Sequence, residues 1–405
     1  MAPRLALSTL GPGLLIAATG VGAGDLITAS LAGSEVGVIV AWAAVVGALL
    51  KWTLNEGIAR WQMATGTTLL EGWILRLHPI VQWAFLVYFL LWSFVVGGAL
   101  VNACGVAGAS LFPIGDANTS KIVWGVVHSL LAVVIVVRGG FKWFEGAMGL
   151  CVAVMVAGVI VTAAMLAGSP APVLDAVSAP MALSRWALAV LGGVGGTVTL
   201  LSYGYWIADR KRSGRSGLIE CRVDLGVGYA MTALFGVSMI VIGSRISISG
   251  RGAGVALDIA AQIGSVLGPI GRGAFLLGFW GAVFSSVLGV WQSTPYLFAD
   301  FLALRRSPAA ARPALGDVDE RPEYRGYLLA LAVISLIWLW APVRTIQLIY
   351  ATVGAAFLPL LAVTLLIMNN RRRWVGQLRN GWAVNALLVA TLLVFSYLGI
   401  AGMTE

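Results

Sequence analysis

Long apolar stretches recur along almost the whole chain. The hydrocarbon core of a bilayer, about 30 Å thick, is crossed by a helix of roughly 20 apolar residues. Windows of this kind fall near residues 9–33, 36–56, 81–104, 122–138, 146–167, 186–208, 225–247, 270–300, 326–342, 345–368 and 382–402. They predict eleven membrane-spanning segments.

Composition agrees with an integral membrane protein. Of the 405 residues, 59% are hydrophobic and only 11% are charged, and the mean hydropathy is +0.92. Alternating polar and apolar residues are scarce, so we expect helices rather than barrel strands. The apolar N-terminal stretch is interpreted as a retained first span rather than a cleaved signal peptide, because many spans follow it.

The basic residues predict the orientation in the membrane. With a cytoplasmic N-terminus, 20 of the 26 Lys and Arg residues fall on the inner side, Lys51 and Arg60 among them. The C-terminus is then outside, in the plasma (inner) membrane. Membrane topology and anionic lipid therefore explain the net charge of +9, and binding of nucleic acid is not required to explain it. Glu56 and Arg60 are expected to form a surface ion pair, and Asp300 to balance Arg305 at the interface.

Two spans have glycine-rich centres in equivalent positions. The first reads "GPGLLIAATGVGAGDLITASLAG" and the sixth "LAVLGGVGGTVTLLSYGYWIADR". Paired interruptions of this kind are typical of transporters built from inverted repeats. We expect the helix breaks at Gly22 and Gly24 in the first span and at Gly195 and Gly196 in the sixth. Close helix packing through small residues is the alternative.

Asp25 lies in the glycine-rich part of the first span. An acid within a span is costly, so it usually has a partner or a function. We expect Asp25 to bind a cation, with hydroxyl groups from Thr28, Thr199 and Ser202 completing the site. Alternatively, Asp25 is the N-cap of the second half-helix.

At this level of detail the chain resembles the Nramp family of proton-coupled divalent-metal transporters, as a divergent member. The family's Asp-Pro-Gly-Asn motif in the first span matches "GAGD", Gly22 to Asp25. "ARWQMATGTTLLE" is similar to the stretch after the family's second span, and "GGTVTLL" is similar to the entry of its sixth. The resemblance implies an all-α LeuT-type fold of two five-helix inverted repeats, residues 1–168 and 169–370, with an additional span in 371–405.

Several positions at which this chain differs from the family motifs affect which ion it is expected to bind. The family's metal-binding aspartate is Gly22 here, its asparagine is Asp25, and its sixth-span methionine aligns with Thr199. Leu201 stands near the family's sixth-span histidine, and Gln347 matches a tenth-span ligand. Hydroxyl and carboxylate oxygens favour a hard ion such as Mg²⁺ or Mn²⁺. The losses argue against tight proton coupling.

These observations predict a monomeric secondary transporter of a divalent cation, working by alternating access in the lipid bilayer. No cofactor is expected, and no catalytic constellation indicates an enzyme. Two alternatives stay open. One is transport of a small organic solute, with a carboxylate at 193–197, an amine at Asp25, and Tyr203, Tyr205 and Trp206 as aromatic walls. The other is a non-transporting sensor or partner protein.

Overall fold

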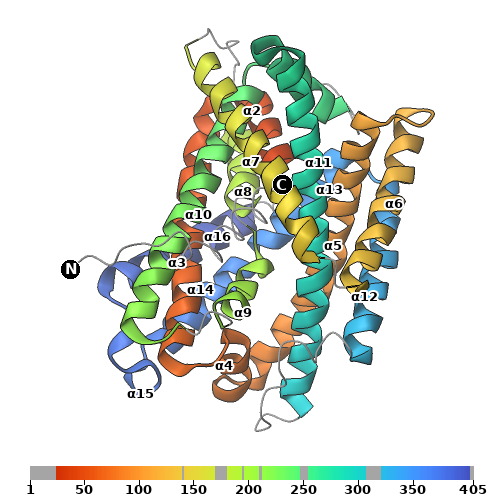
Figure 1. The fold of residues 1–405 in the computed structure, drawn as a ribbon. Coiled ribbons are helices and arrows are strands. Elements are labelled where there is room, and N and C mark those ends of the chain that lie inside the picture. Colours follow the sequence, from red (N-terminus) through yellow and green to blue (C-terminus); the bar gives the residue numbers. More distant parts are fainter. Residues whose placement is uncertain are drawn as a thin grey trace.

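The computed structural model describes residues 24–138, 141–168, 180–193, 196–208, 212–246, 254–306 and 321–401. Helices make up all the regular structure in these ranges, and none of the described residues forms a strand. The helices run mostly along one direction and pack side by side (Figure 1). An apolar chain in a membrane must satisfy its backbone within each segment, which explains the helices.

The elements fall in one order along the chain. They are η2 (Gly24–Thr28), α2 (Ala29–Val36), η3 (Gly37–Val40), α3 (Ala41–Thr65), α4 (Leu69–Arg76), α5 (Pro79–Leu111), α6 (Ala117–Arg138), α7 (Phe141–Leu166), α8 (Pro180–Gly193), η5 (Val198–Leu201), α9 (Ser202–Ala208), α10 (Gly214–Gly243), α11 (Gly254–Arg306), α12 (Pro322–Ile334), η7 (Ser335–Trp340), α13 (Val343–Ala355), α14 (Phe357–Asn369), α15 (Arg372–Val375), η8 (Gly376–Leu378) and α16 (Trp382–Ala401).

The number of spans differs from the eleven expected. Among the described residues, eight helical stretches are long and apolar enough to cross a membrane, or up to nine if the bent pair Arg372–Leu378 and Trp382–Tyr397 is one span. A further apolar helix, Val152–Leu166, is shorter. Three expected spans account for the difference. The start of the first lies outside the described residues, and the rest of it merges with the second in Leu26–Thr65. The fifth contributes only the shorter helix, and the eleventh counts only as part of the bent pair.

Glycines with positive φ divide two of the long stretches. Gly37 (φ 74°) separates α2 from η3 and α3, so the expected first and second spans join through a very short connection. Gly268 (φ 72°, ψ −171°) kinks α11. The chain before this kink is helical from Gly254 on.

Helices α2 and α10 approach each other closely through glycine. A Cβ atom on Gly33 would lie 2.2 Å from the carbonyl oxygen of Ile240, and one on Gly243 would lie 2.2 Å from that of Ser30. Small residues permit this kind of backbone contact between membrane helices. The packing explanation for glycine therefore holds at this crossing. Helix α10 also lies along α3, and α11 along α5 and α7.

Two basic residues do not lie where the charge pattern placed them. Helix α3 continues to Thr65, nine residues beyond the expected end of the second span, so Arg60 is within the helix and 4% exposed. Lys51 is fully buried near the middle of α3. Neither residue is a loop charge. Each pairs with groups that sequence reasoning could not bring next to it.

The α2–α10 crossing gives a stability test. Gly33→Ala places a methyl group against the Ile240 carbonyl, so we expect it to lower the free energy of unfolding by about 1–3 kcal/mol through overpacking. Gly326→Ala is the control, because that glycine is exposed within α12 and has open space around it. Thermal unfolding in detergent measures both. Equal midpoints for the two variants would contradict the close crossing.

Candidate functional site

The second half of the first span begins with a π-helical turn, Gly24–Thr28, which continues into α2. Gly22 lies outside the described residues. The backbone of Asp25 is in the π-helical turn, but its side chain is not among those described. Its role as a ligand or an N-cap therefore stays a prediction. Thr28 is 2% exposed, and its Oγ1 atom has no hydrogen-bond partner among the described residues.

The sixth span is interrupted near its middle. Helix α8 ends at Gly193, and helical structure resumes only with η5 at Val198. Gly196 has φ 78°, which favours glycine, and Thr197 has φ −135° and ψ −93°. Gly195 lies outside the described residues. An interruption here leaves backbone groups without helical partners at a depth where water is absent.

Neighbouring helices hold the far side of this interruption. The indole Nε1 of Trp92, on α5, donates to Thr197 Oγ1 at 2.9 Å. A Cβ atom on Gly354 of α13 would come within 2.7 Å of the Thr197 side chain, so α13 packs directly on it. Tyr88, also on α5, donates to the carbonyl oxygen of Val353 at 2.9 Å. Spans three and ten thus fix the position of the break.

Buried oxygen atoms without partners occur on three of the elements expected to form the site. They are Thr28 Oγ1, Ser202 Oγ and Gln347 Oε1, each without a partner in the part of the chain that the structure describes. Gln347 is 1% exposed, and its amide donates to the carbonyl oxygen of Ala99 at 3.0 Å, which leaves the oxygen as its remaining acceptor. Turn η2 packs against α8 and α13, so Thr28 and Gln347 come from contacting elements. Thr199 is half-buried in η5.

A buried lysine, not expected from the sequence, stands at the near side of the interruption. Lys51 Nζ donates to the carbonyl oxygen of Gly192 at 2.7 Å, in the last turn of α8. A lysine in the middle of an apolar window is a sequence signal that could have found it. Its assignment to a loop concealed that signal.

The second half of the sixth span is tied to two other helices through tyrosines. Tyr205 donates to Asp300 Oδ2 on α11 at 2.6 Å, and Tyr203 to Asp224 Oδ2 on α10 at 3.4 Å. Asp300 is 7% exposed, so the expected interfacial pairing with Arg305 is wrong. Arg305 donates to Gln82 Oε1 instead. Two of the three side chains expected as aromatic walls of a solute pocket, Tyr203 and Tyr205, thus bind carboxylates through their hydroxyl groups.

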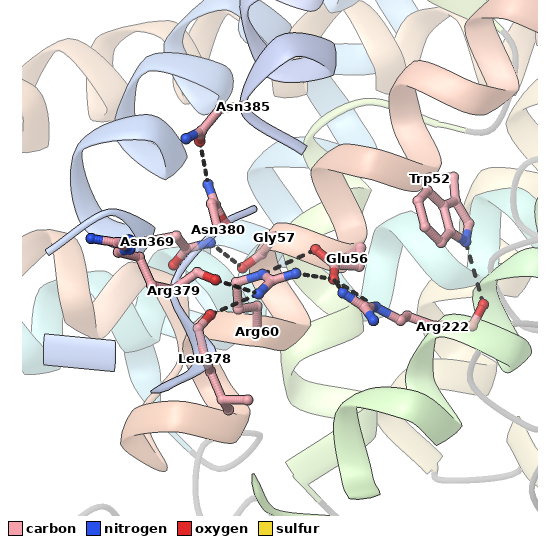
Figure 2. A network of polar contacts seen from close by, with 10 residues as sticks. All are labelled: Trp52, Glu56, Gly57, Arg60, Arg222, Asn369, Leu378, Arg379, Asn380 and Asn385. Carbon is pink, nitrogen blue, oxygen red and sulfur yellow. Dashed lines mark hydrogen bonds and ion pairs between the residues drawn. The ribbon is translucent and has the colours of Figure 1, made fainter. Parts of the chain in front are cut away.

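A second polar network lies on α3 (Figure 2). Glu56 is fully buried and accepts hydrogen bonds from Arg60, one turn along the same helix, and from Arg222 of α10 at 2.8 and 2.9 Å. Arg60 also donates to the carbonyl oxygens of Leu378 at 2.7 Å and Arg379 at 3.2 Å. The expected pair of Glu56 and Arg60 is confirmed, but it is buried rather than at the surface, because α10 and the segment before α16 cover this face of α3.

Asparagines extend the network on its other side (Figure 2). Asn369 donates to the carbonyl oxygen of Gly57 at 2.9 Å, which links α14 to α3. Asn380 donates to Asn385 Oδ1 at 3.0 Å. Together these bonds join α3, α10, α14 and the start of α16. They give the bundle a fixed polar seam away from the break in span six.

The remaining chemistry-bearing side chains are occupied. Among the described residues, no group of three or more His, Cys, Asp or Glu side chains is arranged to hold a metal. Trp280 Nε1 donates to His128 Nε2 at 2.7 Å, so His128 Nδ1 is protonated and donates to the carbonyl oxygen of Trp124 at 2.6 Å.

Solved membrane transporters share the fold of the described residues. A manganese transporter from Eremococcus coleocola, solved with an aromatic bis-isothiourea compound, superposes with a TM-score of 0.71 over 97% of this chain and 85% of its own, at 16% identity. Mhp1, a nucleobase-cation-symport-1 family transporter in a closed conformation, gives 0.57 over 98% and 92%, at 14% identity. The expected fold class, all-α and LeuT-type, is confirmed, although the number eleven is not.

The family follows from the sequence comparison. The profile of the family described as Natural resistance-associated macrophage protein-like (Nramp) matches residues 13–405, and the chain belongs to this family. An uncharacterized protein of Pasteurella multocida (strain Pm70), PM0681, is 22% identical over 357 residues, which is 81% of this chain and 76% of that protein. Family members are transporters rather than enzymes, and a metal ion is their substrate rather than a cofactor.

The Glu56 network predicts an unequal effect of two charge deletions. Glu56→Ala leaves Arg60 buried without its carboxylate, so we expect a loss of about 3–5 kcal/mol in unfolding free energy. Glu323→Ala removes the half-exposed partner of Arg306, and we expect about 1 kcal/mol or less. Thermal and denaturant unfolding of both variants in the same detergent measures the difference. A Glu56 variant as stable as the Glu323 variant would contradict the buried network.

Proposed function

We propose that this protein is a secondary transporter that moves a hard divalent cation, Mg²⁺ or Mn²⁺, by alternating access. The cation binds between the interruptions of the first and sixth spans. Asp25 is the anionic ligand. Thr28, Thr199, Ser202 and Gln347 supply oxygens, with the backbone near Gly22 and the helix ends at Gly24, Gly195 and Gly196.

The buried oxygens without partners are the observation that supports this proposal most. A polar group left unsatisfied in a protein interior costs about 1–3 kcal/mol. Thr28 Oγ1, Ser202 Oγ and Gln347 Oε1 all have this status within the described residues, and all three were named as ligands from the sequence. A ligand that accepts electron pairs from them removes the cost. These atoms are hard oxygen donors, which suit Mg²⁺ and Mn²⁺.

The driving force need not include protons. An interior-negative potential of 100 mV favours entry of a divalent cation by about 4.6 kcal/mol. Thr199 stands where the family has a soft thioether, and Leu201 near its histidine. These two positions supply neither a thioether nor a titratable imidazole. We therefore propose transport down the electrochemical gradient, without tight proton coupling.

The tyrosine bonds of α9 suggest which element moves. Helix α9 is seven residues long and separated from α8 by the interruption, so it can tilt independently of α8. Its tyrosines bind Asp224 and Asp300 in the present conformation. Breaking the bond to Asp300 would let α9 move away from α11 and open the site on that side. The membrane protein is proposed to be a monomer with its N-terminus in the cytoplasm.

Binding measurements test the anionic ligand. We expect wild-type protein to bind Mg²⁺ or Mn²⁺ saturably in calorimetric titration, and Asp25→Ala to bind at least about 100-fold more weakly. Uptake into proteoliposomes should fall in parallel. Wild-type protein that neither binds nor transports Mg²⁺, Mn²⁺ or Ca²⁺ would refute the proposal. Organic solutes, or a sensor role, would then be tested with the same preparation.

Thr28 gives an independent test, because function and stability should change in opposite directions. Thr28→Val removes an unpartnered buried hydroxyl with little change of shape, so we expect stability to rise by about 1 kcal/mol while cation affinity falls. The matched control is Thr232→Val on α10, where Oγ1 donates to the Gly228 carbonyl at 3.0 Å. That variant should lose stability and keep its cation affinity. Loss of stability in Thr28→Val would argue that its hydroxyl is structural.

A further inference from the structure

Lys51 is the buried charge that the proposed cation site does not use. Its side chain is among the largest that are fully buried, and it lies in the interior of the 25-residue helix α3. A charged group in the middle of a membrane span is costly and generally marks a functional position. The bond from Nζ to the Gly192 carbonyl, at 2.7 Å, shows where the charge is directed.

The acceptor of this bond is at a special place in the fold. Gly192 is in the last turn of the 14-residue helix α8, where carbonyl groups lack intrahelical partners and the helix dipole is negative. Neighbouring backbones enclose this turn. A Cβ atom on Gly192 would lie 2.7 Å from the Ala351 carbonyl oxygen of α13, and one on Gly47 of α3 would lie 3.2 Å from Leu191 Cα.

Ends of interrupted helices are where membrane transporters bind cations, because unwound carbonyls and the dipole attract positive charge. At the end of α8 the chain provides an ammonium group of its own. We propose that Lys51 is a tethered cation, which fills a monovalent-cation site at the C-terminal end of α8. The transporter then needs no monovalent ion from solution at this position.

This role has a consequence for coupling. An ammonium group that is part of the chain cannot cross the membrane, so it contributes charge to the break without linking transport to a Na⁺ gradient. The inference rests on the proposed transport function for its uptake measurement, although the site itself can be tested on its own. It also identifies a second proposed determinant of ion selectivity besides Asp25.

A second buried lysine provides a matched control. Lys121 is 3% exposed on α6 and donates to the Ala341 carbonyl at 3.1 Å, just before α13. It resembles Lys51 in burial and in its carbonyl acceptor, but that acceptor is not at the interruption of span six. If buried lysines had only a structural role, alanine substitution of Lys51 and of Lys121 would change Mn²⁺ uptake to the same extent.

The test uses chemical rescue of full-length protein in proteoliposomes. Lys51→Ala removes the atoms of a propylammonium group, so n-propylammonium is the probe, at equal concentration on both sides, with choline as the control cation. We expect Lys51→Ala to lose at least about tenfold of its Mn²⁺ uptake in choline and to recover most of it in n-propylammonium. Lys51→Met, which fills the space with an apolar chain, should lose uptake and show no recovery. Lys121→Ala should keep its uptake in choline.

Unfolding midpoints provide a second readout that needs no transport. We expect n-propylammonium to raise the midpoint of Lys51→Ala relative to choline, and to leave wild type and Lys51→Met unchanged. If wild type carries no divalent cation, the proposed function fails, and this selective stabilisation still supports the cation site. Three results would overturn the inference. The first is unchanged Mn²⁺ uptake in Lys51→Ala, and the second is equal rescue of Lys51→Met. The third is a folded Lys51→Ala protein whose unfolding midpoint and uptake do not respond to n-propylammonium.

Discussion

An interrupted helix within a membrane exposes backbone groups that no water can solvate, and much of this structure is arranged around that constraint. Lys51 satisfies a carbonyl at the end of α8, and Trp92 and Gly354 hold Thr197 on the other side. Three spans are therefore needed to stabilise one break. Helix α3 supplies a hydrogen bond to a backbone carbonyl at the break, α5 supplies one to the Thr197 side chain, and α13 packs against that side chain.

The buried charges divide into two groups with different uses. Glu56, Arg60 and Arg222 neutralise one another and join α3, α10 and the segment before α16, so they stabilise the arrangement of the bundle. Lys51 and the tyrosine-bound acids Asp224 and Asp300 instead surround the two halves of span six. This second group adjoins the proposed cation site and the helix that we propose to move, α9.

The departures from the family motifs become intelligible in this setting. Under the proposed function, Asp25 would supply the carboxylate of the first span, Thr199 a hydroxyl where the family has a thioether, and Lys51 an ammonium group at the break. We propose that these changes favour a hard ion and replace a mobile charge by a fixed one, while the LeuT-type fold stays the same.

The sequence by itself determined the membrane class, the all-helical fold and the interruption of the sixth span, because these follow from local hydropathy and glycine content. The family followed from the resemblance of short motifs. It also identified Thr28, Ser202 and Gln347, whose oxygens are buried without partners in the described structure. It misplaced Lys51, Arg60 and Asp300, since the burial of a charge depends on which other helices cover it. Only the tertiary structure brought Gly192 to Lys51, and Leu378 and Arg222 to the Glu56–Arg60 pair. Such contacts join residues more than 100 positions apart, and no local pattern of apolar residues encodes them.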